Sequence, residues 1–247
     1  WYGQFDPQWG PVGQAGIALS NFSYQRNYFG LDVGTRTVRL QAQAGTLRDE
    51  TDSTGAIIKR YHFGHRLAVR FSDRVQAALW ETTVYSGEDR SMQGSFLNPL
   101  SFLFLANQYG EGDDGNVMIG VDASWRPFRG TTFQAQFALD DFQYQDRGSP
   151  DRYPDRWALT LTAFGPIGRT LSWQALYTQA STLAFRSVSP FDNYVDADVG
   201  IGRGFPDMDR LFVAVTVPVA TRFTVTPDVT LQRQGAARLT DPFPTPD

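Results

Sequence analysis

The chain has 247 residues, carries 22 basic and 26 acidic side chains for a formal net charge of -4, and contains no cysteine. The acidic balance argues against a general nucleic-acid binder, which would show a basic patch and a high pI. The absence of cysteine excludes zinc–thiolate sites and cysteine nucleophiles, and no apolar run approaches the roughly 20 residues that a spanning helix needs.

Segments with two different faces are the main signal in the sequence. Between Tyr61 and Phe71 the side chains of one parity are mostly apolar or aromatic, whereas the other parity includes His62, Arg66 and Arg70. Successive side chains of a strand point to opposite faces, so this pattern predicts a strand with an apolar and a cationic face. Strands of about 9–11 residues, apolar outward and polar inward, are typical of membrane β-barrels. In chain order, the ten predicted strands are residues 15–25, 35–47, 58–72, 75–85, 116–126, 131–144, 156–164, 170–181, 209–218 and 222–233.

The predicted connections alternate in length. Short turns are predicted at 72–74, 127–130, 165–169 and 219–221, and long segments at 86–115, 145–155 and 182–208. Outer-membrane barrels have short periplasmic turns and long extracellular loops, so the alternation predicts which side each strand end faces. We place residues 194–202 in a long outer loop, because counting them as a spanning strand breaks the alternation.

This side assignment puts both chain ends outside the cell, whereas bacterial barrels ordinarily close with both ends in the periplasm. We therefore expect strands to be missing at both ends, and the chain, one domain over residues 1–247, to be part of a larger antiparallel transmembrane β-barrel of about 16–18 strands. The proline-rich tail at 241–247 is interpreted as a loop. No signal peptide opens the chain, so for an outer-membrane protein the signal was removed or the sequence is a segment.

One short helix is predicted in an outer loop. Asn98 and Pro99 precede an apolar run, and Asn is a good N-cap while Pro is favoured at the first helical position. The predicted helix covers 99–107 and folds over or into the barrel mouth. For Asn98 itself, capping is favoured over a functional role.

Aromatic residues are expected in two belts at the membrane interfaces. Those near outer strand ends are Tyr61, Tyr85, Trp157 and Tyr177, and those near inner ends are Phe71, Trp125, Phe133 and Phe164. A soluble β-sandwich or soluble barrel also alternates. Soluble strands average about 5–6 residues, however, and the predicted strands are nearly twice as long.

Polar residues of inward parity form the expected lining of the barrel. They include His62, Arg66, Arg70, Gln76, Asp122, Ser124, Arg126, Gln134, Gln136 and Asp140. Arginine suits carboxylates because its planar fork donates two hydrogen bonds, so the lining could contact an acidic polysaccharide. The alternative, which we favour for any single residue, is an internal Arg–Asp network that satisfies the buried charges. No cofactor or metal site is predicted, because the acidic stretch 111–116 does not match the EF-hand spacing.

The two histidines constrain possible catalysis. His62 and His65 point to opposite faces of one predicted strand, so they cannot bind a metal together without a bulge. An outer-membrane phospholipase would need a serine and a histidine side by side on the lipid-facing rim. His65 has the right parity, but no serine beside it has the expected context.

Several short motifs follow one another in a family-like order. They are GSFLNPL at 94–100, DGNVMIGVD at 114–122 and FQAQFALDDF at 133–142, with WGP at 9–11, Ser20-Asn21 and His65-Arg66-Leu67 upstream. Over residues 9–145 this succession resembles the capsule assembly Wzi family. The resemblance implies an outer-membrane β-barrel that acts as a surface lectin, holds exported capsular polysaccharide and is not an enzyme. Family members also carry a helical segment before the barrel that this chain lacks, which again suggests a partial sequence.

The leading hypothesis is a non-enzymatic outer-membrane protein of a Gram-negative bacterium that binds or retains surface (capsular) polysaccharide and takes part in capsule assembly. The alternatives are an outer-membrane porin or transport channel and, third, a lipid-active enzyme. Expected partners are the polysaccharide and outer-membrane lipids, with no nucleic acid, and the protein is expected to be a monomer. Candidate ligand-binding residues are Arg66, Arg70, Asp122, Arg126, Asp140 and Asp141 on strands, and Tyr109, Phe191 and Tyr194 in outer loops.

Overall fold

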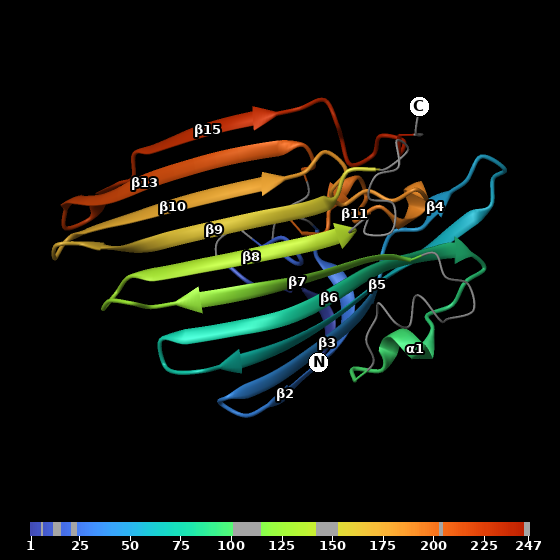
Figure 1. The fold of residues 1–247 in the computed structure, drawn as a ribbon, viewed down its shortest axis with the longest axis horizontal. Helices are drawn as coiled ribbons and strands as arrows, with labels where there is room; N and C mark the ends of the chain where they lie inside the picture. Colours follow the sequence, from blue (N-terminus) through green and yellow to red (C-terminus); the bar gives the residue numbers. More distant parts are fainter. Residues whose placement is uncertain are drawn as a thin grey trace.

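The computed structural model describes residues 1–5, 7–11, 16–20, 24–100, 115–141, 153–202 and 205–244. One antiparallel sheet of 13 strands dominates this part of the chain (Figure 1). The prediction of an all-β, antiparallel fold is confirmed. The strands of the sheet are β1 (Tyr2–Phe5), β2 (Arg26–Gly34), β3 (Val38–Thr46), β4 (Glu50–Thr51), β5 (Ile57–Arg70), β6 (Val75–Glu88), β7 (Asn116–Trp125), β8 (Thr132–Asp141), β9 (Arg156–Ile167), β10 (Leu171–Ala180), β13 (Met208–Ala220), β14 (Phe223–Val225) and β15 (Asp228–Gln234).

The strands follow one another across the sheet nearly in chain order. The path runs from β1 to β10 and then to β13, which pairs with both β14 and β15, while the short β4 pairs with β5. Residues that the sheet leaves out form a helix α1 (Gly94–Leu97), a single 3-10 turn η1 (Pro190–Asp192) and a small hairpin of β11 (Val195–Asp196) and β12 (Val199–Gly200). No helix in the described ranges is long and apolar enough to cross a membrane.

The alternation of connection lengths is also confirmed. In Figure 1 the short turns after β2, β5, β7 and β9 lie at one end of the sheet, and the long connections lie at the other. We call these the short-turn end and the long-connection end. Residues 194–202 contain only the two-residue strands β11 and β12, so they are not a spanning strand, as expected.

One strand prediction is wrong, and a second is only partly right. In 15–25 the described residues 16–20 and 24–25 are not strand, and the first long strand is β2 instead. Ile17, Ala18 and Leu19 are at most 1% exposed, so this apolar run is buried inside the protein and does not face lipid. The predicted strand 222–233 is divided into β14 and β15 around Pro227, which has no backbone N–H for a ladder.

The start of the sheet also differs from expectation. β1 is followed by the long connection to β2 and pairs with β2 antiparallel, so the first strand runs toward the long-connection end, not away from it. The last strand, β15, runs toward that end as expected. The total number of strands in a complete barrel stays a prediction.

The two faces of the sheet differ in polarity, as the alternation predicted. One row of directly paired residues contains Leu67, Leu79, Val121 and Phe137, and these side chains are 44%, 64%, 46% and 38% exposed. An exposed apolar band across so many strands is far larger than the scattered apolar residues of a soluble surface. We call this the outer face, and the opposite, more polar side the inner face.

The aromatic belts are only partly as predicted. Phe71, Trp125 and Phe133 are exposed on the outer face at the short-turn end. Phe164 has the opposite parity and lines a cavity on the inner face instead. Tyr85, at the long-connection end, is only 2% exposed because helix α1 covers it.

A short helix that the sequence analysis did not predict lies just before the predicted one. α1 ends at Leu97, because Pro99 disfavours helical geometry at Asn98, whose φ is -74 and ψ 110. Phe96 packs against the rings of Phe63 and Tyr85 on the outer face, with centroids 5.2 and 5.3 Å apart. This helix therefore lies on the outer face. The predicted helix falls mostly on residues 101–107, which lie outside the described ranges, so its place at the barrel mouth stays a prediction. The side chain of Asn98 accepts a hydrogen bond from the Leu100 N–H at 3.1 Å, as capping predicts.

The apolar core lies on the inner face at the long-connection end. There, residues 7–11 and 16–20 and the connection 181–202 fold against the sheet, and we call them together the plug. Trp9, Leu19 and Phe185 of the plug share one buried cluster with Trp80 and Met118 of the sheet. Gly120 makes room for this packing, because a Cβ there would lie 2.2 Å from the Trp80 ring.

A charged residue on the outer face tests whether lipid covers that face. Leu79→Arg should lower the free energy of unfolding in phospholipid vesicles by about 2–4 kcal/mol, because arginine is costly near the bilayer midplane. The matched control is Gln174→Arg, which adds the same charge to the inner face and should cost less than about 1 kcal/mol. Urea unfolding of both variants gives the comparison, and equal losses would contradict a lipid-facing band.

Candidate functional site

The inner face has a closed half and an open half. At the long-connection end the plug covers it, whereas toward the short-turn end three cavities open on it. The site is therefore the inner face itself, and its chemistry depends on how the plug is held and on what lines the cavities.

A buried tyrosine joins both plug segments to the sheet. The Tyr194 hydroxyl donates to the Ala18 carbonyl at 2.6 Å and lies 3.0 Å from both His62 Nε2 and Thr82 Oγ1. His62 Nδ1 is in turn 3.0 Å from the Tyr28 hydroxyl. All of these side chains are 1% exposed or less, so the network is dry and each member depends on its partners.

Two arginines anchor the hairpin of β11 and β12. Arg26 Nε is 2.7 Å from Asp196 Oδ2, and the other oxygen of Asp196 accepts the Arg48 N–H at 2.9 Å. Arg60, which is 1% exposed, donates to three backbone carbonyls of this segment, those of Phe191, Asn193 and Val195, at 2.6, 3.0 and 3.0 Å. Inward charges of β2 and β5 therefore hold the plug, and none of these anchors was singled out from the sequence.

Asp140 has a structural role. One of its oxygens accepts the Phe185 N–H at 2.9 Å and lies 3.9 Å from the Arg156 guanidinium. The residue is only 6% exposed, and its contacts fix the start of the 181–207 connection. The ligand-binding role expected for Asp140 stays a prediction.

Arg66 and Asp122 form the internal network that was the alternative to ligand binding. Arg66 Nε and Nη2 each lie 2.8 Å from one oxygen of Asp122, and Nη1 lies 2.8 Å from Gln41 Oε1. The Arg66 and Asp122 side chains are 10% and 7% exposed. A bidentate, buried pair of this kind satisfies its own charges, so neither residue is free for a ligand.

Arginines line the open half on the side of β2 to β7. One cavity of about 660 Å³ and a second of about 300 Å³ share Arg70 and Gln76 in their walls. We call the two together the vestibule. The inward parity predicted for Arg70 and Arg126 is confirmed, because both line the vestibule, and their side chains are exposed to solvent there.

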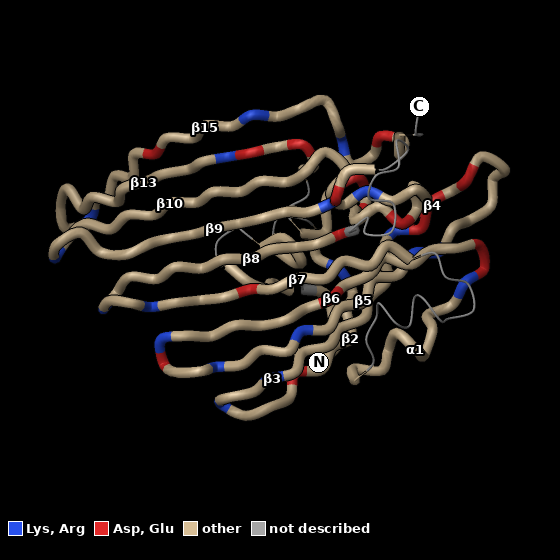
Figure 2. Tube along the Cα trace, in the orientation of Figure 1, with Lys and Arg blue, Asp and Glu red and all other residues tan. Residues whose placement is uncertain are grey.

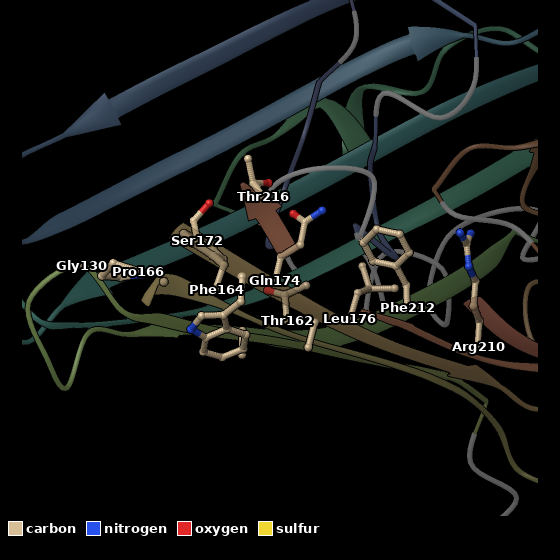
Figure 3. Close-up of a pocket in the computed structure, with 14 residues that line it drawn as sticks. Gly130, Thr162, Phe164, Pro166, Ser172, Gln174, Leu176, Arg210, Phe212 and Thr216 are labelled. Carbon is tan, nitrogen blue, oxygen red and sulfur yellow. The ribbon is translucent and has the colours of Figure 1, made fainter. Parts of the chain in front are cut away.

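A third cavity, of about 760 Å³, lies over the inner faces of β9, β10 and β13, and we call it the trough. Figure 3 shows its wall running from Gly130 and Pro166 at one end to Arg210 at the other. Phe164, Leu176 and Phe212 give this wall apolar surface, and hydroxyl and amide side chains lie between them. The Nε atom of Arg210 is buried without a hydrogen-bond partner in the described chain.

Two of the loop residues proposed to bind sugar fold inward. Tyr194 is 1% exposed at the centre of the plug, and Phe191 is partly buried with its carbonyl bound by Arg60. Their aromatic character is used for packing, because the connection folds inward. Tyr109 lies outside the described residues, and so does the side chain of Asp141.

The two histidines face opposite sides of β5, as predicted. His62 is inside the network of Tyr194, whereas His65 on the outer face lies 3.2 Å from Glu81 Oε1. Both members of the His65–Glu81 pair are less than 10% exposed. In the described part of the chain, no group of three or more histidine and acidic side chains could hold a metal ion.

One carboxyl of the plug, that of Asp192, is buried where its ionised form is disfavoured. Asp192 is 1% exposed, and burial raises its pKa from 3.8 to about 6, although Ser86, Ser189 and the charges of Arg60 and Arg90 oppose the shift. Its Oδ1 is buried without a hydrogen-bond partner. The plug is thus sensitive to pH at this position.

Comparison with known proteins places the chain in no family. No family model matches it, and no curated protein matches it. Among solved structures it is similar to the toluene transporter TodX of Pseudomonas putida, at 10% sequence identity and a TM-score of 0.37, over 88% of this chain and 70% of that one. A likeness at this level says nothing about what the present chain binds or moves. The resemblance to the Wzi family thus stays one of short motifs.

The Arg66–Asp122 pair should be costly to break. Asp122→Ala leaves a buried guanidinium without its carboxylate, and we expect a loss of about 3 kcal/mol in the free energy of unfolding. The control is Asp32→Ala at the Asp32–Arg39 pair, whose side chains are 23% and 61% exposed, with an expected loss below about 1 kcal/mol. Urea unfolding in vesicles measures both, and similar losses would contradict the importance of burial.

The Asp192 carboxyl should make the plug less stable as pH rises. Its pKa is higher in the folded state, so the folded state binds the proton more tightly, and stability falls between about pH 4 and pH 6. Relative to Asp192→Asn, we expect the wild type to lose up to about 3 kcal/mol over this range. Thermal unfolding of both proteins from pH 4 to pH 7.5 measures the difference, and parallel curves would contradict it.

Proposed function

We propose that this chain forms the wall of a gated solute pathway in the outer membrane of a Gram-negative bacterium. The observation that carries the proposal is the division of one long-stranded sheet into an exposed apolar outer face and a polar inner face with cavities. A lipid-facing band outside and a polar lining inside are what a barrel with an internal pathway requires.

The direction of the pathway follows from the connections. With short turns toward the periplasm and long connections outward, the vestibule and the trough open to the periplasm, and the plug lies toward the cell surface. The short turns after β5 and β9 and the long connection 181–207 define these two ends. A solute that moves along the inner face from one end to the other would have to pass the plug.

The contacts between the plug and the sheet are of a kind that can separate. Beside its apolar packing it is held by separable polar anchors, Arg60 to three carbonyls and Arg26 to Asp196. Polar anchors of this kind can be exchanged for water or solute, whereas a purely apolar interface cannot. We therefore interpret the structure as the closed state of a pathway, in preference to a lumen that is permanently filled.

Retention of capsular polysaccharide, implied by the motif resemblance, has less support. Of its candidate aromatic residues, Tyr194 is buried and Phe191 is partly buried, so they offer little surface to a sugar ring. Its test is the amount of cell-associated and released polysaccharide in a strain that lacks the full-length protein. Shedding of polysaccharide would favour this role, and an unchanged surface coat would argue against it. Contacts with polysaccharide and lipid, and the monomeric state, stay predictions.

Release of the plug should open the pathway. In planar bilayers we expect the wild type to conduct rarely, and Arg60→Ala combined with Asp196→Ala to conduct for longer periods, because the hairpin loses its main polar anchors. Lys59→Ala is the matched control, since Lys59 neighbours Arg60 but pairs with the exposed Asp49. Heat-modifiable migration on gels checks that each variant is folded. Folded variants that never conduct would contradict the proposed pathway.

A further inference from the structure

The vestibule combines an open cavity with an excess of positive charge. Six arginines and two aspartates line its two cavities, although the whole chain has a formal net charge of -4. The lining arginines are Arg36, Arg39, Arg66, Arg70, Arg74 and Arg126.

Most of these arginines have no acidic partner. Arg39 pairs with Asp32, and Arg66 pairs with Asp122. Within the described ranges, the other four guanidinium groups, those of Arg36, Arg70, Arg74 and Arg126, make no hydrogen bond or ion pair with the protein. Like charges held together repel one another, so an arrangement without internal partners favours a ligand that supplies the negative charge.

Most acidic residues of the chain lie elsewhere. Figure 2 shows them mostly at the long-connection end, whereas basic residues occur both there and at the short turns. Acidic residues in or beside the long connections include Asp49, Glu50, Asp52, Glu88, Asp89, Asp192, Asp196, Asp198, Asp207, Asp209 and Asp241. A cleft lined by one sign of charge raises the local concentration of the opposite ion, so this separation leaves the vestibule attractive to anions.

We propose that the vestibule is a binding site for small oxyanion-bearing solutes, such as phosphate esters or polycarboxylates, and that Arg70 and Arg126 are its main contacts. Arg70 lines both cavities, and Arg126 lines the smaller one. The planar guanidinium fork matches the paired oxygens of phosphate and carboxylate groups. A volume of about 660 Å³ is in the range of small-molecule sites. The inference names the solute class of the pathway proposed above and rests on that proposal.

Binding can be measured without conduction. Isothermal titration of the folded, detergent-solubilised protein with sodium pyrophosphate at low ionic strength should show binding, and titration with citrate should do the same. Arg70→Gln combined with Arg126→Gln should weaken pyrophosphate binding about tenfold, since charge-assisted hydrogen bonds are lost. The control is Arg222→Gln, which removes an exposed arginine at the same end that lines neither cavity. Equal affinities of the double variant and this control would overturn the inference.

Ion selectivity gives the second readout. Under a potassium chloride gradient, the plug-released protein should prefer anions, and the same double glutamine variant should lose this preference. Arg70→Lys combined with Arg126→Lys keeps the charge and should keep the preference, and its loss would overturn the inference. If pyrophosphate binds as expected but no variant conducts, the anion site stands and the proposed pathway fails. Heat-modifiable migration again confirms that each variant is folded.

Discussion

Side-by-side pairing of long antiparallel strands is the constraint on which everything else in this protein depends. In an apolar surrounding every backbone N–H and C=O must find a partner, and neighbouring strands provide it. The same pairing fixes register, so Leu67, Leu79 and Val121 fall in one row on the outer face. A slip of one residue would exchange the two faces of a strand and place Arg66 or Asp122 on the apolar outer face.

The space over the inner face is occupied differently at its two ends. The plug fills it at one end with aromatic and aliphatic side chains, and it is tied to the sheet through Tyr194, Arg60 and Arg26. At the other end the cavities remain, lined by arginines on one side and by mixed polar and aromatic groups on the other. A filled half and an open half on one surface are the physical basis of the proposed gated pathway.

Charge is distributed along the same direction. Acidic residues gather about the long connections, whereas arginines occur at both ends of the sheet (Figure 2). Where opposite charges meet inside, as at Arg66–Asp122 and Arg26–Asp196, they hold structure. Where arginines have no acidic partner, as at Arg70 and Arg126, their positive potential can attract an anionic solute. Arginine thus holds the plug at the long-connection end, and it is the proposed anion contact at the short-turn end.

The sequence alone determined most of the long strands, their two faces, the inward parity of Arg66, Arg70, Asp122 and Arg126, and the alternation of short and long connections. These are local properties, because a period of two is readable within any ten residues. Only the tertiary structure decided that 16–20 and Tyr194 are interior, that Asp140 holds a loop, and that α1 lies on the outer face. The plug contacts join residues far apart, 176 positions for Tyr194 and Ala18 and 170 for Arg26 and Asp196. A local pattern carries no information on such pairs. An apolar run has the same sequence pattern whether lipid or another part of the protein covers it.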